Sequence, residues 1–248
     1  LGYLNTSLTA GPDTFAETGI SAPGAAYMWY DMILNRLYIP GETLVSTGSG
    51  PELVPAVTIV DVSQSVPQDQ VFPGGAIQIL TVPPGDRSGS DPCSSTTQPP
   101  ANPLLVVAAT SLPDGSRAYI GSYYDDGTGN VCPQVTVIDT TNNSIKTATA
   151  IPGFPDATIS SSPYYAPACT KTRDLVGPTG SGFRFSMAVA GDSSRAYLAS
   201  CDGGNVSIIY TSNDSYAANA LAPSSARSPI PPSNQPPPQN PVFVFAGP

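Results

Sequence analysis

The sequence contains no histidine, and this absence excludes much of the chemistry that enzymes perform near neutral pH. The chain alone cannot form a Ser-His-Asp or Cys-His catalytic unit, the common zinc and copper sites or a CxxCH haem attachment. Glutamate is also scarce, since only Glu17, Glu42 and Glu52 occur and they do not cluster. No catalytic motif is therefore expected.

Basic charge is scarce as well. The 248 residues hold two lysines, Lys146 and Lys171, and nine Lys plus Arg against eighteen Asp plus Glu give a net charge of −9. Such a chain offers no basic patch for phosphates, so we expect no nucleic-acid partner. The longest apolar run, Leu104–Ala109, is far shorter than the roughly 20 residues that cross a bilayer. We therefore expect no membrane span.

The chain is rich in glycine and proline, with 23 and 29 residues, yet apolar residues still make up 40% of it. This composition is typical of a loop-rich folded domain rather than of disorder. The chain begins at Leu1 rather than Met, which indicates a mature or trimmed product. Four cysteines in an acidic, lysine-poor chain indicate an oxidising setting, so we expect a secreted or cell-surface protein.

An Arg–hydrophobic–Tyr–Ile/Leu strand occurs three times, and a second β-rich strand follows each copy. Successive copies of the Arg lie 81 and 78 residues apart, a steady register that indicates internal duplication. The first strands are Arg36–Ile39, Arg117–Ile120 and Arg195–Leu198, and the second strands are Val57–Asp61, Val135–Asp139 and Val206–Tyr210.

The second repeat shows the whole unit. An apolar strand, Leu105–Ala109, precedes a Pro-Asp-Gly turn within Leu112–Ser116, and a last strand, Ser144–Ile151, follows the Thr-Thr-Asn-Asn turn. Proline presets φ, aspartate caps its own backbone and glycine accepts positive φ, so these are turns with a physical basis. Four antiparallel strands with tight turns make a propeller blade. The predicted fold is all-β: a β-propeller or partial propeller of about three four-stranded antiparallel blades, with long loop insertions on one face.

The segments Leu112–Ser122 and Val135–Ile145 carry a family resemblance. Their sequences, LPDGSRAYIGS and VTVIDTTNNSI, resemble the YVTN-type β-propeller repeat of secreted and surface-layer proteins. The match is weaker in the first repeat, where Tyr30–Leu34 replaces the turn, and it covers about two thirds of the chain. The resemblance implies a propeller fold and a location outside the cytoplasm. It brings no catalytic residue with it.

We predict one propeller-like domain over residues 1–248. It divides into an N-terminal edge-strand segment (1–24), three blades (25–85, 86–152 and 153–222) and a proline-rich tether with a terminal strand (223–248). The repeated Arg and Tyr are expected to be structural. Because strand residues alternate between faces, each Tyr would pack on the next blade, and each Arg would satisfy a carbonyl or carboxylate there.

The long segments 40–55, 83–103, 121–133 and 153–182 are all predicted second-to-third-strand loops or crossings between blades, which places them on one face. Binding sites on rigid scaffolds usually lie in such loops. Four tyrosines in these loops are candidates for stacking on a sugar or anchoring a partner, with packing beneath a loop as the alternative. They are Tyr123, Tyr124, Tyr164 and Tyr165.

Two loops carry oxygen ligands that calcium could use. Neither supplies the six to eight oxygens that this ion prefers, and ordinary hairpin turns are the alternative explanation. The candidates are Asp125, Asp126, Asn130 and Asp202. No other cofactor is expected.

The four cysteines permit three pairings. Cys93 and Cys169 fall in crossings between blades, whereas Cys132 and Cys201 fall in the connections between the Arg-containing strand and the strand that follows it, so the repeat favours Cys93–Cys132 and Cys169–Cys201.

The C-terminal segment predicts self-association. Pro223–Pro241 has eight prolines in nineteen positions and is expected to be an extended spacer. The strand-forming residues Val242, Phe243, Val244 and Phe245 follow it. Three blades do not close a propeller, so this strand could pair with an open sheet edge of its own chain or of a neighbour.

We therefore expect a non-enzymatic structural or binding module. Its expected partners are another copy, another surface protein or a glycan. The alternative is a lactonase-like propeller hydrolase that uses carboxylates and a bound cation.

Overall fold

A computed structural model of the chain describes residues 2–5, 14–17, 20–25, 27–63, 77–87, 89, 91–95, 104–156, 161, 185–201 and 205–217. Within these residues the regular elements are strands, apart from one short 3₁₀ turn, η1 (Pro92–Ser95). The described part contains no helix that is long and apolar enough to cross a membrane. The predicted all-β class is confirmed.

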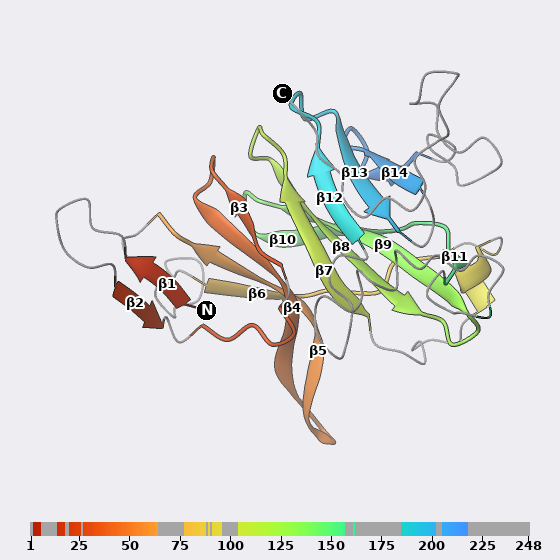
Figure 1. The fold of residues 1–248 in the computed structure, drawn as a ribbon, viewed down its shortest axis with the longest axis horizontal. Coiled ribbons are helices and arrows are strands. Elements are labelled where there is room, and N and C mark those ends of the chain that lie inside the picture. Colours follow the sequence, from red (N-terminus) through yellow and green to blue (C-terminus); the bar gives the residue numbers. More distant parts are fainter. Residues whose placement is uncertain are drawn as a thin grey trace.

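Three antiparallel sheets follow one another along the chain, each with its strands in sequence order (Figure 1). The first blade contains β3 (Trp29–Asp31), β4 (Arg36–Thr47), β5 (Gly50–Asp61) and β6 (Ile77–Thr81). The second contains β7 (Leu105–Ser111), β8 (Arg117–Asp125), β9 (Asn130–Asp139) and β10 (Ser144–Ala150), and β11 (Phe154–Pro155) also pairs with β9. The third contains β12 (Phe185–Val189), β13 (Arg195–Ser200), β14 (Asn205–Tyr210) and β15 (Ser215–Tyr216). A separate hairpin, β1 (Gly2–Asn5) with β2 (Thr14–Glu17), precedes them.

The first turn of each blade is tight, as the Pro-Asp-Gly sequence predicts for the second repeat. Gly115 has a φ of 70°, and Ser193 takes the equivalent conformation at 59°. The first repeat turns equally tightly without Pro-Asp-Gly, because the Asp31 carboxylate accepts backbone hydrogen bonds within the turn and Asn35 takes a φ of 52°. Asn tolerates this left-handed region better than most residues.

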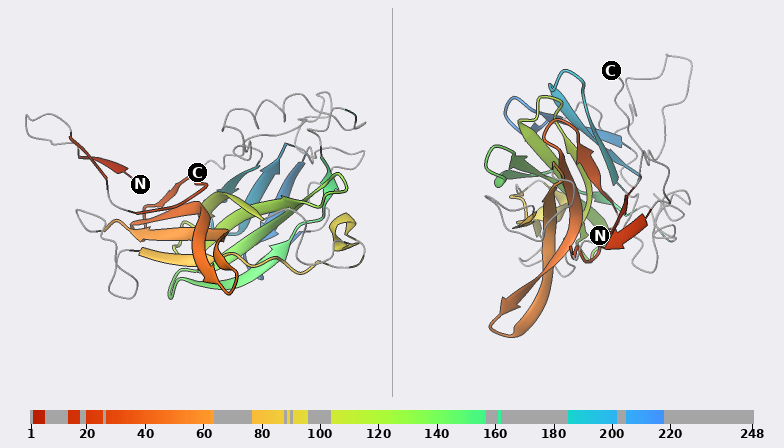
Figure 2. Two further views of the ribbon diagram at one scale, coloured as in Figure 1. Left: turned by 90° about the horizontal axis from the view of Figure 1, so that it is seen from below. Right: turned by 90° about the vertical axis from the view of Figure 1, so that its left-hand side faces the viewer.

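Two predicted long loops are instead extensions of hairpins. The segment 40–55 belongs to β4 and β5, which stay paired out to Thr47 and Gly50 and project as an arm from the first blade (Figure 2). The segment 121–133 belongs to β8 and β9, with only residues 126–129 between the strands. The segment 40–55 was predicted to be a loop because it contains Pro40, Pro51 and Pro55, which are unusual inside strands. In a two-stranded arm a missing N–H can face an unpaired edge, where proline is tolerated.

The blades pack face to face through two shared cores. Tyr38, Val57 and Ile59 of the first blade are fully buried against β7 and β8 of the second. The opposite face of the second blade packs on the third, where a Cβ at Gly121 would lie 3.0 Å from Met187 Sδ. The sheets formed by the described residues do not close into a ring, so the first and third blades each have one face that packs on no other described blade.

Candidate functional site

Arg36 joins the first blade to the second. Its Nη1 donates hydrogen bonds to the Thr140 carbonyl oxygen at 2.7 Å and to Asn143 Oδ1 at 2.8 Å. Both acceptors lie in the turn between β9 and β10, where Asn143 has a φ of 50°. We call this contact, from the Arg that opens the second strand of one blade to the last turn of the next, an arginine clamp.

Arg117 makes the same clamp between the second and third blades. Its Nη1 donates to the Thr211 carbonyl oxygen and, at 2.7 Å, to Asp214 Oδ1. Asp214 occupies the place of Asn143, with a φ of 56°. The expected structural role of the repeated Arg is confirmed at both junctions.

The second clamp has more donor side chains than the first, because its acceptor is a carboxylate. Asp214 is 2% exposed, and it also accepts hydrogen bonds from the Tyr119 hydroxyl at 2.8 Å and from Lys146 Nζ at 2.7 Å. A buried carboxylate is tolerated when it is paired and hydrogen-bonded. Here three side chains of the second blade donate hydrogen bonds to one carboxylate of the third.

Burial against the next blade also changes how the repeated tyrosines titrate. Burial raises the pKa of Tyr38 to about 12, although the nearby Arg36 opposes the shift. Burial and the hydrogen bond to Asp214 raise the pKa of Tyr119 as well. Both hydroxyls therefore stay neutral in the folded protein at pH values where an exposed tyrosine has begun to ionise.

We expect the protein to lose stability in alkali as a consequence. The two tyrosines are harder to ionise in the folded protein than in the unfolded chain, where a tyrosine has its ordinary pKa of about 10. Since the folded pKa values are raised, their contribution is complete below pH 10 and falls as the pH rises towards those values. A difference of one bound proton between the folded and unfolded states gives a slope of about 1.4 kcal/mol per pH unit.

Urea unfolding between pH 8 and 11.5 should show this decline, and Tyr119→Phe should make it shallower. Tyr210→Phe, at an exposed tyrosine, should leave the slope unchanged; an equal change would contradict the argument.

A second cluster holds the chain that crosses from the first blade to the second. Arg87 Nη1 donates to Asp91 Oδ2 at 2.8 Å and to the Ile151 carbonyl at 2.9 Å, and its Nη2 donates to the Pro133 carbonyl at 2.8 Å. The guanidinium carbon lies 5.3 Å from the ring centroid of Tyr124. Sequence reasoning missed this cluster. The one available signal is the Arg–Asp pair four residues apart, just before Cys93.

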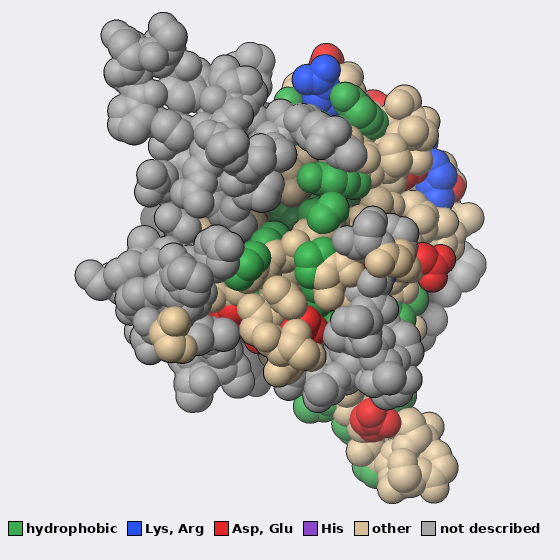
Figure 3. All heavy atoms as spheres, turned by 90° about the vertical axis from the view of Figure 1, so that its right-hand side faces the viewer, with side chains coloured by type: hydrophobic (Ala, Val, Ile, Leu, Met, Phe, Trp, Pro, Cys, Tyr) green, Lys and Arg blue, Asp and Glu red, His purple; other side chains and the backbone are tan. Residues whose placement is uncertain are grey.

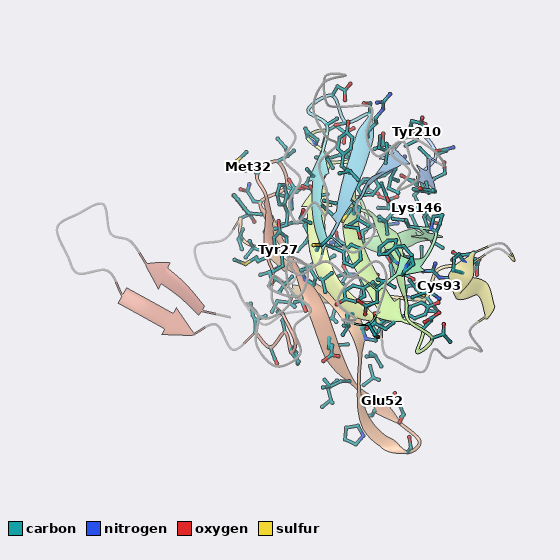
Figure 4. The ribbon with its side chains drawn as sticks, turned by 45° about the vertical axis from the view of Figure 1, so that its right-hand side comes forward. Tyr27, Met32, Glu52, Cys93, Lys146 and Tyr210 are labelled. Carbon is teal, nitrogen blue, oxygen red and sulfur yellow. A yellow bond between two sulfur atoms is a disulfide. The ribbon has the colours of Figure 1, made fainter. Side chains whose placement is uncertain are left out.

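The disulfide Cys93–Cys132 lies beside this cluster and links the crossing to β9 (Figure 4). It is the first of the two pairings that the repeat favours. Gly153 leaves room for it, since a Cβ there would lie 2.3 Å from Cys93 Sγ. Cys201 is buried and disulfide-bonded, but Cys169 lies outside the described residues, so the second pairing stays a prediction.

The predicted stacking tyrosines of the second blade are core residues. Tyr123 and Tyr124 lie in β8, not in a loop, and each is 2% exposed. Tyr123 faces the third blade, with its ring centroid 4.9 Å from that of Phe185, while Tyr124 faces the first. Packing, the alternative left open by the sequence, is what the structure shows for both. Tyr164 and Tyr165 lie outside the described residues.

The calcium candidates around Asp126 form a hairpin turn. The Asp126 carboxylate accepts four hydrogen bonds, two each from Thr128 and Asn130, at 2.6–3.0 Å. Burial would raise the pKa of this carboxyl, but the hydrogen bonds outweigh burial and lower it. Asp125 ends β8 beside the turn. Asp202, the remaining candidate, lies outside the described residues.

The side chains of Cys93, Asp126 and Cys132 come within 4.8 Å of one another. The two sulfurs form a disulfide, however, and only a thiolate is a good metal ligand. This group is therefore a structural junction, in which the disulfide and the hairpin turn meet.

No family model and no curated protein matches the sequence. Among solved structures, hydrazine synthase from Kuenenia stuttgartiensis aligns at 14% identity over 80% of this chain and 36% of that one, with a TM-score of 0.41. A protein from Bacteroides fragilis, proposed to be a 6-phosphogluconolactonase, aligns at 10% identity over 79% and 38%, with a TM-score of 0.38. AztD from Citrobacter koseri aligns at 11% identity over 84% and 48%, with a TM-score of 0.37.

The chain thus spans less than half the length of each of these structures. With TM-scores this low, the likenesses carry no argument about function. The propeller-type architecture is supported instead by strand order and by the repeated register, and the YVTN-type assignment stays a resemblance.

Proposed function

We propose that this chain is a non-enzymatic structural or binding module of propeller type, which works outside the cytoplasm and self-associates by exchanging the terminal strand Val242–Phe245. The observation that supports the structural role best is the arginine clamp at each inner junction, where Arg36 and Arg117 donate to the last turn of the next blade. The strand exchange is proposed from the sequence, in which the proline-rich segment ends in four residues of high β propensity.

The described part of β15 pairs with one end of β14, and the residues that follow Ala217 lie outside the described part. β15 pairs only with Ile209 and Tyr210, and the Ala217 N–H donates to the Ile208 carbonyl at 2.8 Å. Among the described residues, Asn205–Ser207 has no strand on that side. A sheet edge can serve as a template for another strand, and Val242–Phe245 have the β propensity to pair with one. Those four residues lie outside the described part of the chain.

A structural role is supported by the contacts of the charged side chains. Arg36 and Arg117 hold neighbouring blades together, Lys146 and Asp214 complete the second junction, and Arg87 with Asp91 anchors the crossing. These groups are partnered within the protein.

An extracytoplasmic setting is supported by the disulfide. Cys93 and Cys132 are 1% and 0% exposed, and a bond of this kind persists in oxidising compartments. In such a setting the proposed partners are another copy of the chain, a surface protein or a glycan.

Deletion of Ser233–Pro248 tests the strand exchange. Higher-order species should disappear in sedimentation velocity while circular dichroism still shows folded blades. A full-length control with Val242 and Val244 replaced by proline should behave like the deletion, because proline cannot join the ladder. Assembly that survives both changes would contradict strand exchange. Lactone hydrolysis by the purified protein that a chelator abolishes would overturn the non-enzymatic assignment.

A further inference from the structure

The β4–β5 arm is two-stranded over its outer half. Among the described strands, β3 pairs with β4 as far as Tyr38, and β6 pairs with β5 as far as Ala56. Beyond these points the described residues 43–47 and 50–54 pair only with each other. Figure 3 shows the end of the arm projecting beyond the rest of the molecule, and Figure 4 labels Glu52 on it. Because a lone two-stranded hairpin is only marginally stable in water, such an arm gains stability from a further strand.

The backbone register decides which groups point outward from the arm. The Val62 N–H donates to the Asn35 carbonyl at 2.8 Å, so these two residues form a hydrogen-bonded pair of the ladder. Such pairs recur at every second residue, and the last of them joins Thr47 to Gly50. The residues between them point their N–H and C=O groups to the two outer edges. They include Glu42, Leu44 and Ser46 on β4 and Pro51, Leu53 and Pro55 on β5.

The outer edge of β5 is blocked by proline. Pro51 and Pro55 have no N–H to donate, and the Pro55 carbonyl already accepts from the Val82 N–H at 2.8 Å. Proline on an exposed edge is one of the ways in which proteins prevent pairing with another chain. Between the two prolines, Leu53 supplies the one outward N–H of this edge.

The outer edge of β4 is closed at its base and unprotected beyond it. The Glu42 N–H donates to the Pro23 carbonyl at 2.8 Å. Leu44 and Ser46 follow, and both are exposed. Among the described residues, their outward N–H and C=O groups have no hydrogen-bond partner. We call residues 43–47 the open edge of the arm.

The open edge is also apolar and uncharged. Leu44 lies opposite Leu53 across the arm, and the two side chains are 63% and 49% exposed. Residues 43–47 include no charged residue, and no Lys or Arg occurs between Arg36 and Arg87. Since lysine is a common protection of sheet edges, its absence here leaves the open edge free to accept a strand.

We propose that the open edge pairs with the same edge of a second copy of this chain, antiparallel and about a two-fold axis at Val45. In this register Leu44 of each copy lies opposite Ser46 of the other. The outward groups of these two residues are then all used, in four hydrogen bonds between the copies. The two arms become one four-stranded sheet whose outer edges are the proline-blocked strands.

The side chains of the arm favour a second copy over a strand from another protein. Leu44 and Leu53 share one face of the arm, because residues opposite each other in a sheet point to the same side. The two-fold axis brings the same two leucines of the second copy to that face, so apolar surface that is wet in the monomer becomes covered. A strand of unrelated sequence would not supply this match.

Charge does not oppose the contact, although the chain is acidic. Glu52 lies opposite Val45 across the arm, on the face away from the leucines. In the four-stranded sheet the Glu52 residues of the two copies are three strand spacings apart, about 14 Å, which exceeds the screening length at physiological salt. The contact joins like surfaces and is therefore isologous, so it closes at two copies. The expected assembly is a dimer.

Ser46→Pro tests the pairing by sedimentation velocity of the full-length chain over a concentration series. The change removes an N–H that points away from β5, so the arm keeps its own hydrogen bonds, as it does at Pro51 on the opposite strand. Each dimer loses two hydrogen bonds, and its dissociation constant should rise about 30-fold. Ser46→Ala is the matched control, since it keeps the N–H and should leave the dimer unchanged. Circular dichroism of both variants checks that the blades stay folded.

Cysteine cross-linking tests the register. Val45→Cys should form a disulfide between copies under mild oxidation, because a non-hydrogen-bonded antiparallel pair holds its Cα atoms about 4.5 Å apart, within the reach of a disulfide. Thr43→Cys is the control on the same face of the same strand. It would lie opposite Thr47 of the second copy rather than opposite itself, so it should cross-link far more slowly.

The contact does not involve the terminal strand Val242–Phe245, so the two proposals fail separately. Deletion of Ser233–Pro248 should leave the arm dimer intact, and the same deletion made in the Ser46→Pro chain reports on strand exchange alone. A wild-type chain that stays monomeric, a dimer that is as tight in Ser46→Pro as in Ser46→Ala, or equal cross-linking at residues 43 and 45 would overturn the pairing of the arms.

Discussion

Replacing Asp214 with alanine is expected to lower the free energy of unfolding by about 3 kcal/mol. The substitution leaves the buried Tyr119 hydroxyl without its acceptor and leaves the guanidinium of Arg117 with one partner fewer. Lys146 is 43% exposed in its side chain and can turn to water, so it contributes little to the loss. Urea denaturation followed by circular dichroism measures the change.

Asn143→Ala is the matched control, because Asn143 holds the same turn position in the second blade and receives Arg36. Its side chain is neutral and accepts the hydrogen bond of a single arginine, so its loss should cost only about 1–2 kcal/mol. Asp214→Asn should fall between the wild type and alanine, since an amide oxygen can still accept from one donor. If Asp214→Ala lowered the free energy of unfolding by no more than Asn143→Ala does, the carboxylate would not stabilise its junction more than the amide stabilises the other one.

The blades were predictable because each is local in sequence. Alternating apolar residues and turn residues fix the second and third strands of every repeat, and the repeated Arg after each first turn shows that it has one role in all copies. A junction between blades also follows from alternation, since the Tyr two residues after the Arg must point to the same face.

The acceptors of the arginines could not be found in this way. Asn143 and Asp214 lie 107 and 97 residues from the arginines that bind them. Nothing in the local sequence distinguishes them from the other Asn and Asp residues of polar turns. Arg87 and Asp91 were missed for a similar reason, because their carbonyl partners come from β9 and the chain after β10.

The tyrosine pair at Tyr123 and Tyr124 shows where the pattern itself misled. The acidic and glycine-rich residues that follow, 125–130, indicate a loop, and two adjacent aromatics in a loop suggest a binding surface. β8 continues instead to Asp125, so alternation sends one tyrosine into each inter-blade core. The β8–β9 hairpin lies between the first and third blades, so both of its faces are buried. The sequence of one repeat does not show that a blade packs on each side.

Removing the disulfide is expected to have the largest effect on stability. Cys93 and Cys132 are 39 residues apart, and closing a loop of that size restricts the unfolded chain by roughly 4 kcal/mol in the chain-entropy account. The double variant Cys93→Ala/Cys132→Ala removes this bond and leaves Cys201 untouched. Its free energy of unfolding should fall by that amount, and its urea m-value should rise because the unfolded chain becomes less compact.

The Arg87–Asp91 pair provides the comparison that isolates the covalent link. The Asp91 carboxylate accepts hydrogen bonds from the backbone N–H of Cys93 and of Gly153, so the crossing keeps its folded position when the sulfurs are gone. Asp91→Ala should therefore destabilise the native state without raising the m-value, whereas the cysteine variant acts mainly on the unfolded chain. Because the two changes act on different states, the cysteine variant should keep a native near-ultraviolet spectrum. A cysteine variant with an unchanged m-value and an altered native spectrum would show that the disulfide shapes the folded crossing itself.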